Sequence, residues 1–216
     1  NKIGYIELPV AYDGLSVVVN KANDFVDYLT VEELNKMWKS GSTVKKWSDV
    51  RPSWPDREIK LFGPGVDSGT FDYFTEVINH KSGSCRTDFT KNEDDNFLVT
   101  GIAGDENALG FFGYVYYASN KDKLRVVPID AGKGPIAPNM KTINDGTYAP
   151  LARPIFIYVS TESAKRKEVK DFVHYYLREA PKLVKAVGYV PLPQSMYADG
   201  LKRFDAGQAG RSTTGG

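Results

Sequence analysis

The segment from residue 59 to residue 78 constrains the fold most, because its pattern changes from strand to helix across a glycine-rich turn. Ile59 to Phe62 is typical of a short strand, and Gly63-Pro-Gly-Val-Asp-Ser-Gly-Thr70 follows it. Apolar residues then recur at helical spacing at Phe71, Phe74, Val77 and Ile78. A chain that contains such a strand–turn–helix unit is expected to fold in the α/β class.

Strand-like and helix-like segments alternate along the rest of the chain. Near the start we predict two strands, Tyr5 to Val10 and Leu15 to Val19, separated by a turn at Asp13-Gly14. Thr30 and Glu33 form a capping box for a helix that should run from Thr30 to Lys39. Further strands are expected at 109–114, 125–129 and 155–159, and further helices at 92–102, at 115–123, after a Ser160 cap and from Pro181 onward.

The charge balance excludes some function classes. Lys and Arg number 28 against 27 Asp and Glu, so the formal net charge is +1 and gives no general attraction for nucleic acid or an anionic membrane. The longest apolar runs are far shorter than the ~20 residues of a membrane span. One cysteine, Cys85, and two histidines predict no metal site, and no motif predicts a cofactor.

The tetrapeptide Asp67-Ser-Gly-Thr70 is the candidate site, because it joins the strand to the start of the helix. The first backbone amides of a helix have no intrahelical acceptor, and a small anion can supply one. Ser68 and Thr70 add hydroxyl donors, and Gly69 lets an anion approach the backbone. The alternative is that Asp67 or Ser68 only caps the helix.

The sequence does not match the more specific motifs of nucleotide binding and of serine catalysis. The segment from 67 to 70 has no lysine, which a Walker loop requires, and Ser68 stands where a dinucleotide fingerprint needs glycine. Asp-Ser-Gly also occurs around serine-protease nucleophiles, but the chain shows no nucleophile elbow and no evident base. Nucleotide binding and hydrolase chemistry are therefore disfavoured.

Several segments together resemble the phosphate-binding proteins of bacterial ABC transporters, the PstS family, in the branch of the cyanobacterial SphX-type receptors. The glycine-rich segment from Gly63 to Phe74 carries the signature. The resemblance continues in order in Tyr5–Gly14, Val17–Asn20, Leu29–Leu34, Trp47–Val50, Asn107–Tyr114 and Arg153–Tyr158.

The resemblance implies a two-lobed periplasmic-binding-protein fold of the second type, with the ligand in the cleft. Residues 21–150 would form a nearly complete central lobe that carries the anion loop. Residues 1–10 and 160–216 would belong to the other lobe, and residues 11–20 and 152–159 would be the hinge crossings. Relatives of this family begin with a further N-terminal segment, so the second lobe is expected to lack its N-terminal part here.

The implied function is that of an extracytoplasmic receptor, not an enzyme, which binds inorganic phosphate and delivers it to the permease subunits of an ABC importer. Such a receptor is periplasmic, or extracellular and membrane-associated. The chain begins with Asn1 and carries no export signal, so it is expected to be a processed or truncated product. Two alternatives stay open: a receptor for another tetrahedral oxyanion such as sulfate or arsenate, and a phosphatase-type enzyme that uses the same anion cradle.

The phosphate ligands implied are Ser68, Gly69 and Thr70, with Arg86 as the counter-charge. Family members place an arginine four residues before the serine, but Pro64 stands there in this chain. Arg86 is the candidate because a planar guanidinium matches two phosphate oxygens. Asp67 could accept a hydrogen bond from a protonated phosphate oxygen, orient Arg86 or cap the helix.

Overall fold

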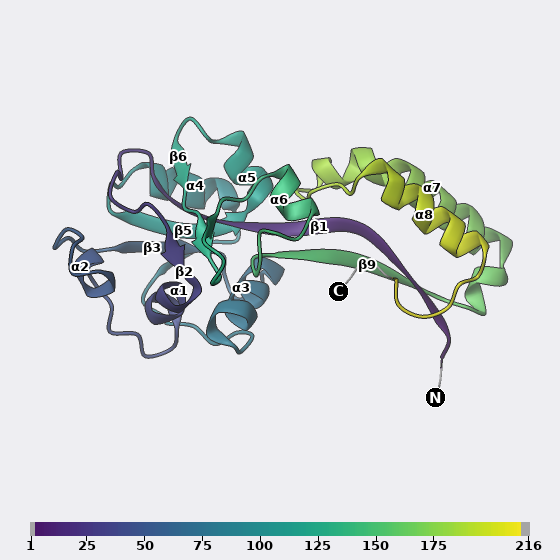
Figure 1. Cartoon of the computed structure of the whole chain (residues 1–216), viewed down its shortest axis with the longest axis horizontal. Helices are drawn as coiled ribbons and strands as arrows, with labels where there is room; N and C mark the ends of the chain where they lie inside the picture. The colour runs from purple at the N-terminus through teal and green to yellow at the C-terminus, as the bar shows by residue number, and fades with distance from the viewer. Residues whose placement is uncertain (1–2, 213–216) are drawn as a thin grey trace. The chain divides into compact units, whose positions relative to one another are not determined.

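The computed structural model describes residues 3–212, which divide into two units (Figure 1). Unit 1 comprises Asn1–Asp13 and Arg153–Gly216, of which residues 1–2 and 213–216 lie outside the described residues. Unit 2 comprises Gly14–Ala152. Both boundaries fall inside the segments 11–20 and 152–159 that we expected to cross between lobes. Their action as a hinge stays a prediction.

Unit 2 is built on a mixed sheet with the strand order β4-β3-β5-β1-β6. Strands β3 (Lys60–Gly63), β4 (Thr90–Lys91) and β5 (Ala108–Gly113) are parallel, with Phe62 opposite both Thr90 and Gly110. Strand β1 (Tyr5–Asn20) runs antiparallel to β5 and to β6 (Leu124–Val126). Since the parallel strands end at one edge, the loops that follow β3, β4 and β5 all leave the sheet there, where ligands of open α/β sheets bind.

Helices cover both faces of this sheet. On one face, α4 (Asp95–Ala103) packs Leu98 and Ile102 in a cluster with Val18 and Phe112. On the other face, the Phe74 ring of α3 (Gly69–Asn79) stacks on Phe111, with ring centroids 3.7 Å apart. The side chains of adjacent residues of β5 thus pack into hydrophobic cores on opposite faces of the sheet, because side chains alternate between the two faces along a strand.

Shorter elements complete unit 2. A three-stranded sheet has the order β2-β7-β8, and the capping box of Thr30 and Glu33 starts α1 as predicted. These elements are β2 (Leu29–Thr30), α1 (Val31–Trp38), α2 (Trp47–Val50), α5 (Tyr114–Ser119), β7 (Ile129–Asp130), β8 (Pro135–Ile136) and α6 (Met140–Asn144).

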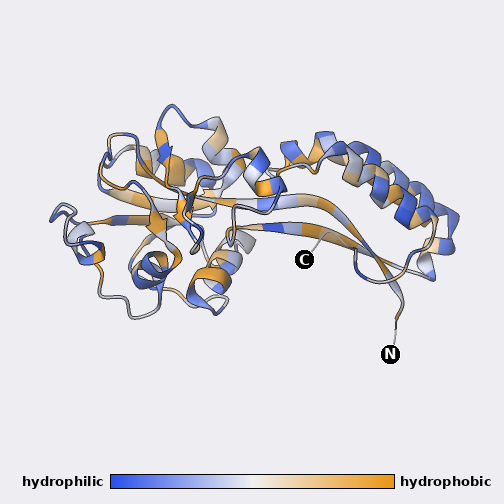
Figure 2. Ribbon diagram, viewed as in Figure 1, coloured by the Kyte–Doolittle hydropathy of each residue, from blue (hydrophilic) through white to orange (hydrophobic). Residues whose placement is uncertain are grey.

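Unit 1 contains the first part of β1 and all but the first residue of strand β9 (Ala152–Ser160), which pairs with β1. A 3-10 turn η1 (Ser163–Lys165) and helices α7 (Lys167–Ala186) and α8 (Gln194–Asp205) follow. Tyr197 of α8 donates its hydroxyl to the carbonyl oxygen of Val10 at 2.9 Å and so ties the helix to β1. Figure 2 shows apolar residues along much of β1 and mainly hydrophilic residues on α7 and α8.

The predicted turn at Asp13-Gly14 is wrong, because β1 is one continuous strand of 16 residues. Asp13 is buried, and its carboxylate lies 3.4 Å from Nη2 of Arg153. At Gly14, a Cβ atom would lie 2.6 Å from Cδ1 of Ile143, so the glycine serves close packing. Residues that often form turns thus have packing roles here.

Two helix-boundary predictions are also wrong. Ser160 does not cap a helix, since η1 intervenes and α7 begins at Lys167. Pro181 does not begin a new helix but lies inside α7. An internal proline costs ~3 kcal/mol or more. The buried stripe of α7 continues across it, with Leu177 and Ala180 before it and Val184 after it, and we infer that this packing offsets the cost.

Candidate anion-binding site

The glycine-rich turn and the start of α3 form the candidate site, and the structure confirms the predicted strand–turn–helix unit. The amide of Ser68 donates to the carbonyl oxygen of Gly65 at 3.2 Å, which closes the turn. Ser68 is the N-cap of α3, and its hydroxyl oxygen accepts from the amide of Thr70 at 3.2 Å. The first helical hydrogen bond follows, from the amide of Asp72 to the carbonyl oxygen of Ser68 at 3.1 Å.

This arrangement leaves donors available at the helix start. Between residues 3 and 212, the amides of Gly69 and Phe71 have no acceptor, and the amide of Thr70 has only the Ser68 hydroxyl. Gly69 is exposed, and a Cβ atom built there would meet no atom within 4 Å. The helix dipole favours negative charge at this position. The helix start therefore has two amides without an acceptor, those of Gly69 and Phe71, and the hydroxyl groups of Ser68 and Thr70 lie next to them in sequence.

Asp67 fills neither of its expected structural roles. The N-cap of α3 is Ser68, and Arg86 is oriented by another carboxylate, that of Asp88. Asp67 itself is exposed at the edge of the turn. Its third expected role, as acceptor for a protonated anion oxygen, stays a prediction.

Arg86 is buried, with 7% of its surface exposed, and its guanidinium group already has partners. Nε and Nη2 donate to the two carboxylate oxygens of Asp88, both at 2.7 Å. Nη1 donates to the carbonyl oxygens of Met37 at 3.0 Å and Val44 at 2.8 Å. Asp88 accordingly has its pKa lowered to about 2, chiefly by these hydrogen bonds. Four of the five guanidinium N–H groups are thus engaged. Two bind Asp88 in the same loop, and two hold this loop against Met37 of α1 and Val44 in the segment after it.

An acidic segment that leads into α4 borders the glycine turn. The amide of Asn92 donates to the carbonyl oxygen of Gly63 at 3.2 Å. Oε1 of Glu93 lies only 2.0 Å from where a Cβ atom of residue 65 would stand, so Gly65 makes room for this carboxylate. Burial, with the charges of Asp94 and Glu93, raises the pKa of Asp95 to about 6. The carboxylate of Glu93 therefore lies against the glycine turn that precedes α3.

Sequence reasoning did not identify Lys91, Asn92 or Glu93 as neighbours of the turn. The strand that brings them there, β4, has only two residues, which is too short for a two-residue hydrophobic period to be visible. The local signal was the Asn-Glu-Asp-Asp run, which we included only in the helix predicted at 92–102.

Cys85 lies in the loop before Arg86 as a half-buried free thiol. Its Sγ atom lies 3.2 Å from the carbonyl oxygen of Trp38. Burial raises the pKa of the thiol to about 11. A thiol with such a pKa is almost fully protonated at neutral pH and makes a poor nucleophile.

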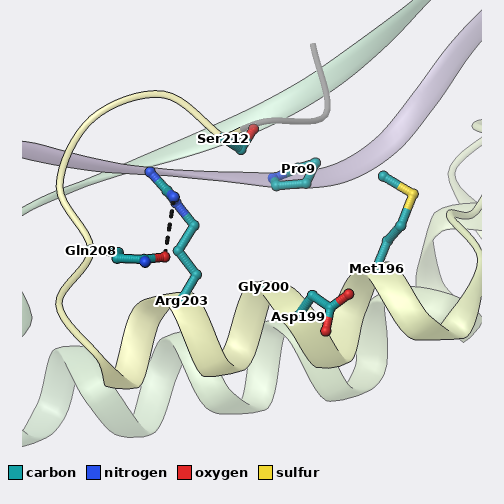
Figure 3. Close-up of a pocket in the computed structure, with 7 residues that line it drawn as sticks. All are labelled: Pro9, Met196, Asp199, Gly200, Arg203, Gln208 and Ser212. Carbon is teal, nitrogen blue, oxygen red and sulfur yellow. Dashed lines mark hydrogen bonds between the residues drawn. The ribbon is translucent and has the colours of Figure 1, made fainter.

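Unit 1 contains a hollow of ≈ 270 Å³ between β1 and α8, lined by Pro9, Met196, Asp199, Gly200, Arg203, Gln208 and Ser212 (Figure 3). Its basic group, Arg203, donates to the carbonyl oxygens of Glu7, Gly210 and Arg211 and to the side chain of Gln208. Because this guanidinium is engaged and Asp199 adds negative charge, the hollow is poorly suited to an anion.

The described residues contain neither a membrane-spanning helix nor a cluster of metal-ligating side chains. Between residues 3 and 212, no helix is both long and apolar enough to cross a bilayer. In the same range, no group of three or more His, Cys, Asp or Glu side chains is placed to hold a metal ion.

A family model described as a PBP superfamily domain matches residues 1–180. Protein SphX of Synechocystis sp. (strain ATCC 27184 / PCC 6803 / Kazusa) is 43% identical over 213 residues, which are 97% of this chain and 63% of that protein. The phosphate-binding protein PstS of Staphylococcus saprophyticus is 41% identical over 206 residues, 94% of this chain and 62% of that protein. The chain therefore spans less than two thirds of the length of these relatives.

Solved structures agree with these matches. A possible phosphate binding protein from Planctomyces limnophilus DSM 3776 superposes with a TM-score of 0.91 at 47% identity, over 95% of this chain and 74% of that one. An ABC-type phosphate transport receptor from Vibrio cholerae superposes with a TM-score of 0.71 at 24% identity, over 88% of this chain and 73% of that one. The second match supports the fold alone.

Proposed function

Because the chain belongs to the PBP superfamily and, within it, to the family of the SphX and PstS phosphate-binding proteins, we propose that it binds inorganic phosphate at the start of α3. It does so as part of an extracytoplasmic receptor that passes phosphate to the permease subunits of an ABC importer. No covalent bond is made or broken in this role.

The observation that carries the proposal is the open helix start. A tetrahedral anion placed over Gly69 can accept from the unpaired amides of Gly69 and Phe71 and from the Thr70 hydroxyl. Hydrogen bonds from such groups to an ionised acceptor are shorter and stronger than those between neutral groups. The helix dipole acts in the same direction.

The carboxylate of Glu93, which lies against Gly65 of the glycine turn, supports phosphate over sulfate. Hydrogen phosphate carries a proton that it can donate to a carboxylate, whereas sulfate at neutral pH offers only acceptors. A carboxylate that faces sulfate would have no hydrogen bond and would repel it. Asp67, exposed beside the turn, is a further candidate acceptor for that proton.

Arg86 stays a prediction as a phosphate ligand, and its internal partners favour a positioning role. By tying Asp88 to the carbonyl oxygens of Met37 and Val44, it fixes the loop that leads into β4. Strand β4 in turn brings the residues after Lys91 to the glycine turn.

The test is isothermal titration of the chain with phosphate and, separately, with sulfate. We expect heat of binding for phosphate only. Thr70→Ala should weaken binding by roughly 10- to 100-fold, the loss of one hydrogen bond to a charged group. Thr100→Ala is the matched control, because Thr100 is exposed on α4 and its hydroxyl donates only to the carbonyl oxygen of Asn96.

Three results would contradict the proposal: equal affinity for sulfate, unchanged phosphate affinity in Thr70→Ala, or no phosphate binding by this chain and by any longer product that contains it. Equal affinity for sulfate would instead indicate a general oxyanion receptor. Hydrolysis of a phosphate ester that Ser68→Ala abolishes would indicate an enzyme.

A further inference from the structure

We propose that Lys91 is the cationic ligand of the anion site. This inference rests on the proposed phosphate-binding function. A dianion bound at a helix start gains from a full positive charge nearby. The sequence assigned this task to Arg86, whose guanidinium group is instead engaged inside unit 2. A cation near the turn that has no such partners is therefore a better candidate than Arg86.

The register of the sheet places Lys91 at the correct edge. Lys91 ends β4 and lies opposite Gly63, the last residue of β3, from which the glycine-rich turn departs. Paired residues of parallel strands direct their side chains to the same face. A Cβ atom at Gly63 would lie 2.9 Å from Phe111 and 3.3 Å from Phe89. That is the face on which α3 packs through Phe74, so Lys91 shares a sheet face with α3.

An aromatic pair connects the Lys91 ammonium group with the first turn of α3. Nζ of Lys91 lies over the ring of Phe89, 5.2 Å from its centroid. The Phe89 ring is stacked on that of Phe71, with centroids 6.4 Å apart and an interplanar angle of 19°. Phe71 is the third residue of α3, and its amide is one of the two without an acceptor. The ring that the Lys91 ammonium group covers thus contacts the first turn of α3, which carries one of the open amides.

The charge of Lys91 is not neutralised by a neighbour. Among residues 3–212, Lys91 forms no ion pair, whereas Lys46 pairs with Asp56 and Lys60 with Glu58. Two of the carboxylates that follow Lys91 lie against other groups. Glu93 lies against Gly65, and Asp94 accepts from the amide of Asn96 at 2.9 Å. An ammonium group held by a ring face and without a carboxylate partner is available to an anion.

The flexibility and donor geometry of a lysine side chain also suit the binding of a tetrahedral anion. Its flexible four-carbon stem lets the ammonium group move from the Phe89 ring toward an arriving anion without moving the backbone. Its three donors impose no planar geometry, which matches a tetrahedral ligand bound chiefly through backbone amides.

The experiment is titration of the chain with inorganic phosphate at two salt concentrations. Lys91→Met should weaken binding by roughly 10- to 100-fold, while Lys91→Arg should stay within about threefold of the wild type. Added KCl should weaken phosphate binding less in Lys91→Met than in the wild type, because a screened charge pair has been removed. A purely structural role for Lys91 would not change this salt dependence.

Lys81→Met is the matched control. Lys81 is exposed and lies just beyond the other end of α3, a helix of 11 residues and so about 16 Å long. It removes the same charge from the same unit and should leave phosphate affinity unchanged.

The outcomes separate the two proposals. Wild-type affinity in Lys91→Met, with binding lost in Thr70→Ala, would overturn the role of Lys91 and leave the phosphate site standing. An equal loss in Lys81→Met would assign the effect to net charge and also overturn it. If the wild-type chain, and any longer product that contains it, bound no phosphate, both proposals would fail.

Discussion

In the proposed site, Gly69 is a residue whose substitution should affect binding far more than folding. It is the first residue of α3, and a Cβ atom there would meet nothing within 4 Å. The same open space is where an anion must approach the amides of Gly69 and Phe71. A methyl group added at residue 69 would therefore occupy the position that we propose for the anion, without a clash with the protein.

We predict that Gly69→Ala folds with a melting temperature equal to or slightly above that of the wild type, because alanine is the better helix former. Its phosphate affinity should fall by at least about tenfold, since the methyl group excludes the anion from the amides. Thermal unfolding and phosphate titration of the same sample measure the two effects. A variant with unchanged affinity would show that the anion does not sit over the start of α3.

At this scale, sequence reasoning located Ser68, Gly69 and Thr70 correctly at a helix start, because strand, glycine turn and helix lie within twenty residues of one another. It could not determine the partners of Arg86. Those partners include Met37 and Val44, more than forty residues earlier in the chain, and backbone carbonyl oxygens carry no sequence signal.

Among the elements, β1 shows why local turn preference can mislead. Asp-Gly is a strong turn signal. Here the strand continues because Leu15 to Val19 pair with β5, and because Ile143 from α6 lies where a side chain at residue 14 would stand. Long-range packing therefore overrides a two-residue preference, and no periodicity within residues 5–20 reveals it.

We predict that Gly14→Ala lowers the free energy of unfolding by about 1–3 kcal/mol, through overpacking against Cδ1 of Ile143. Ile143→Val removes that methyl group, so the free energy of unfolding of the double variant should be higher than the sum of the two single changes predicts. Denaturant unfolding of the four proteins measures this coupling. Strict additivity would mean that residue 14 contacts something else.

The helices were predicted better than their ends. The start of α1 was predicted correctly because a capping box is a local signal, whereas α7 was divided in two at Pro181 because proline normally breaks a helix. The helix continues past Pro181 because a stripe of buried residues, which includes Leu177 and Val184, packs on both sides of it. Only the packed structure shows that this stripe is continuous.

At the scale of the whole molecule, the acidic segment beside the site affects stability. The pKa of Asp95 is about 6 in the folded chain, against an ordinary value of 3.8, chiefly because of burial. A raised carboxyl pKa means that the folded state prefers the protonated form. The resulting stabilisation is present at low pH and is lost as the pH rises from about 4 through 6.

We predict that Asp95→Asn is more stable than the wild type above pH 7, by about 1 kcal/mol after allowance for solvent screening, and that this difference disappears near pH 4. Thermal unfolding of both proteins from pH 4 to pH 8 measures it. A stability difference that stays constant across this range would show that Asp95 titrates normally.

The protonated thiol of Cys85 makes the chain convenient for building a fluorescent phosphate reporter. It is the one cysteine in the sequence, and a thiol with a pKa of about 11 should react with maleimide dyes at neutral pH roughly a hundredfold more slowly than an exposed one. A second cysteine introduced as Val66→Cys, at an exposed position in the glycine turn, can therefore be labelled selectively without first removing the native one. The dye would then stand directly beside the residues that we propose hold the anion.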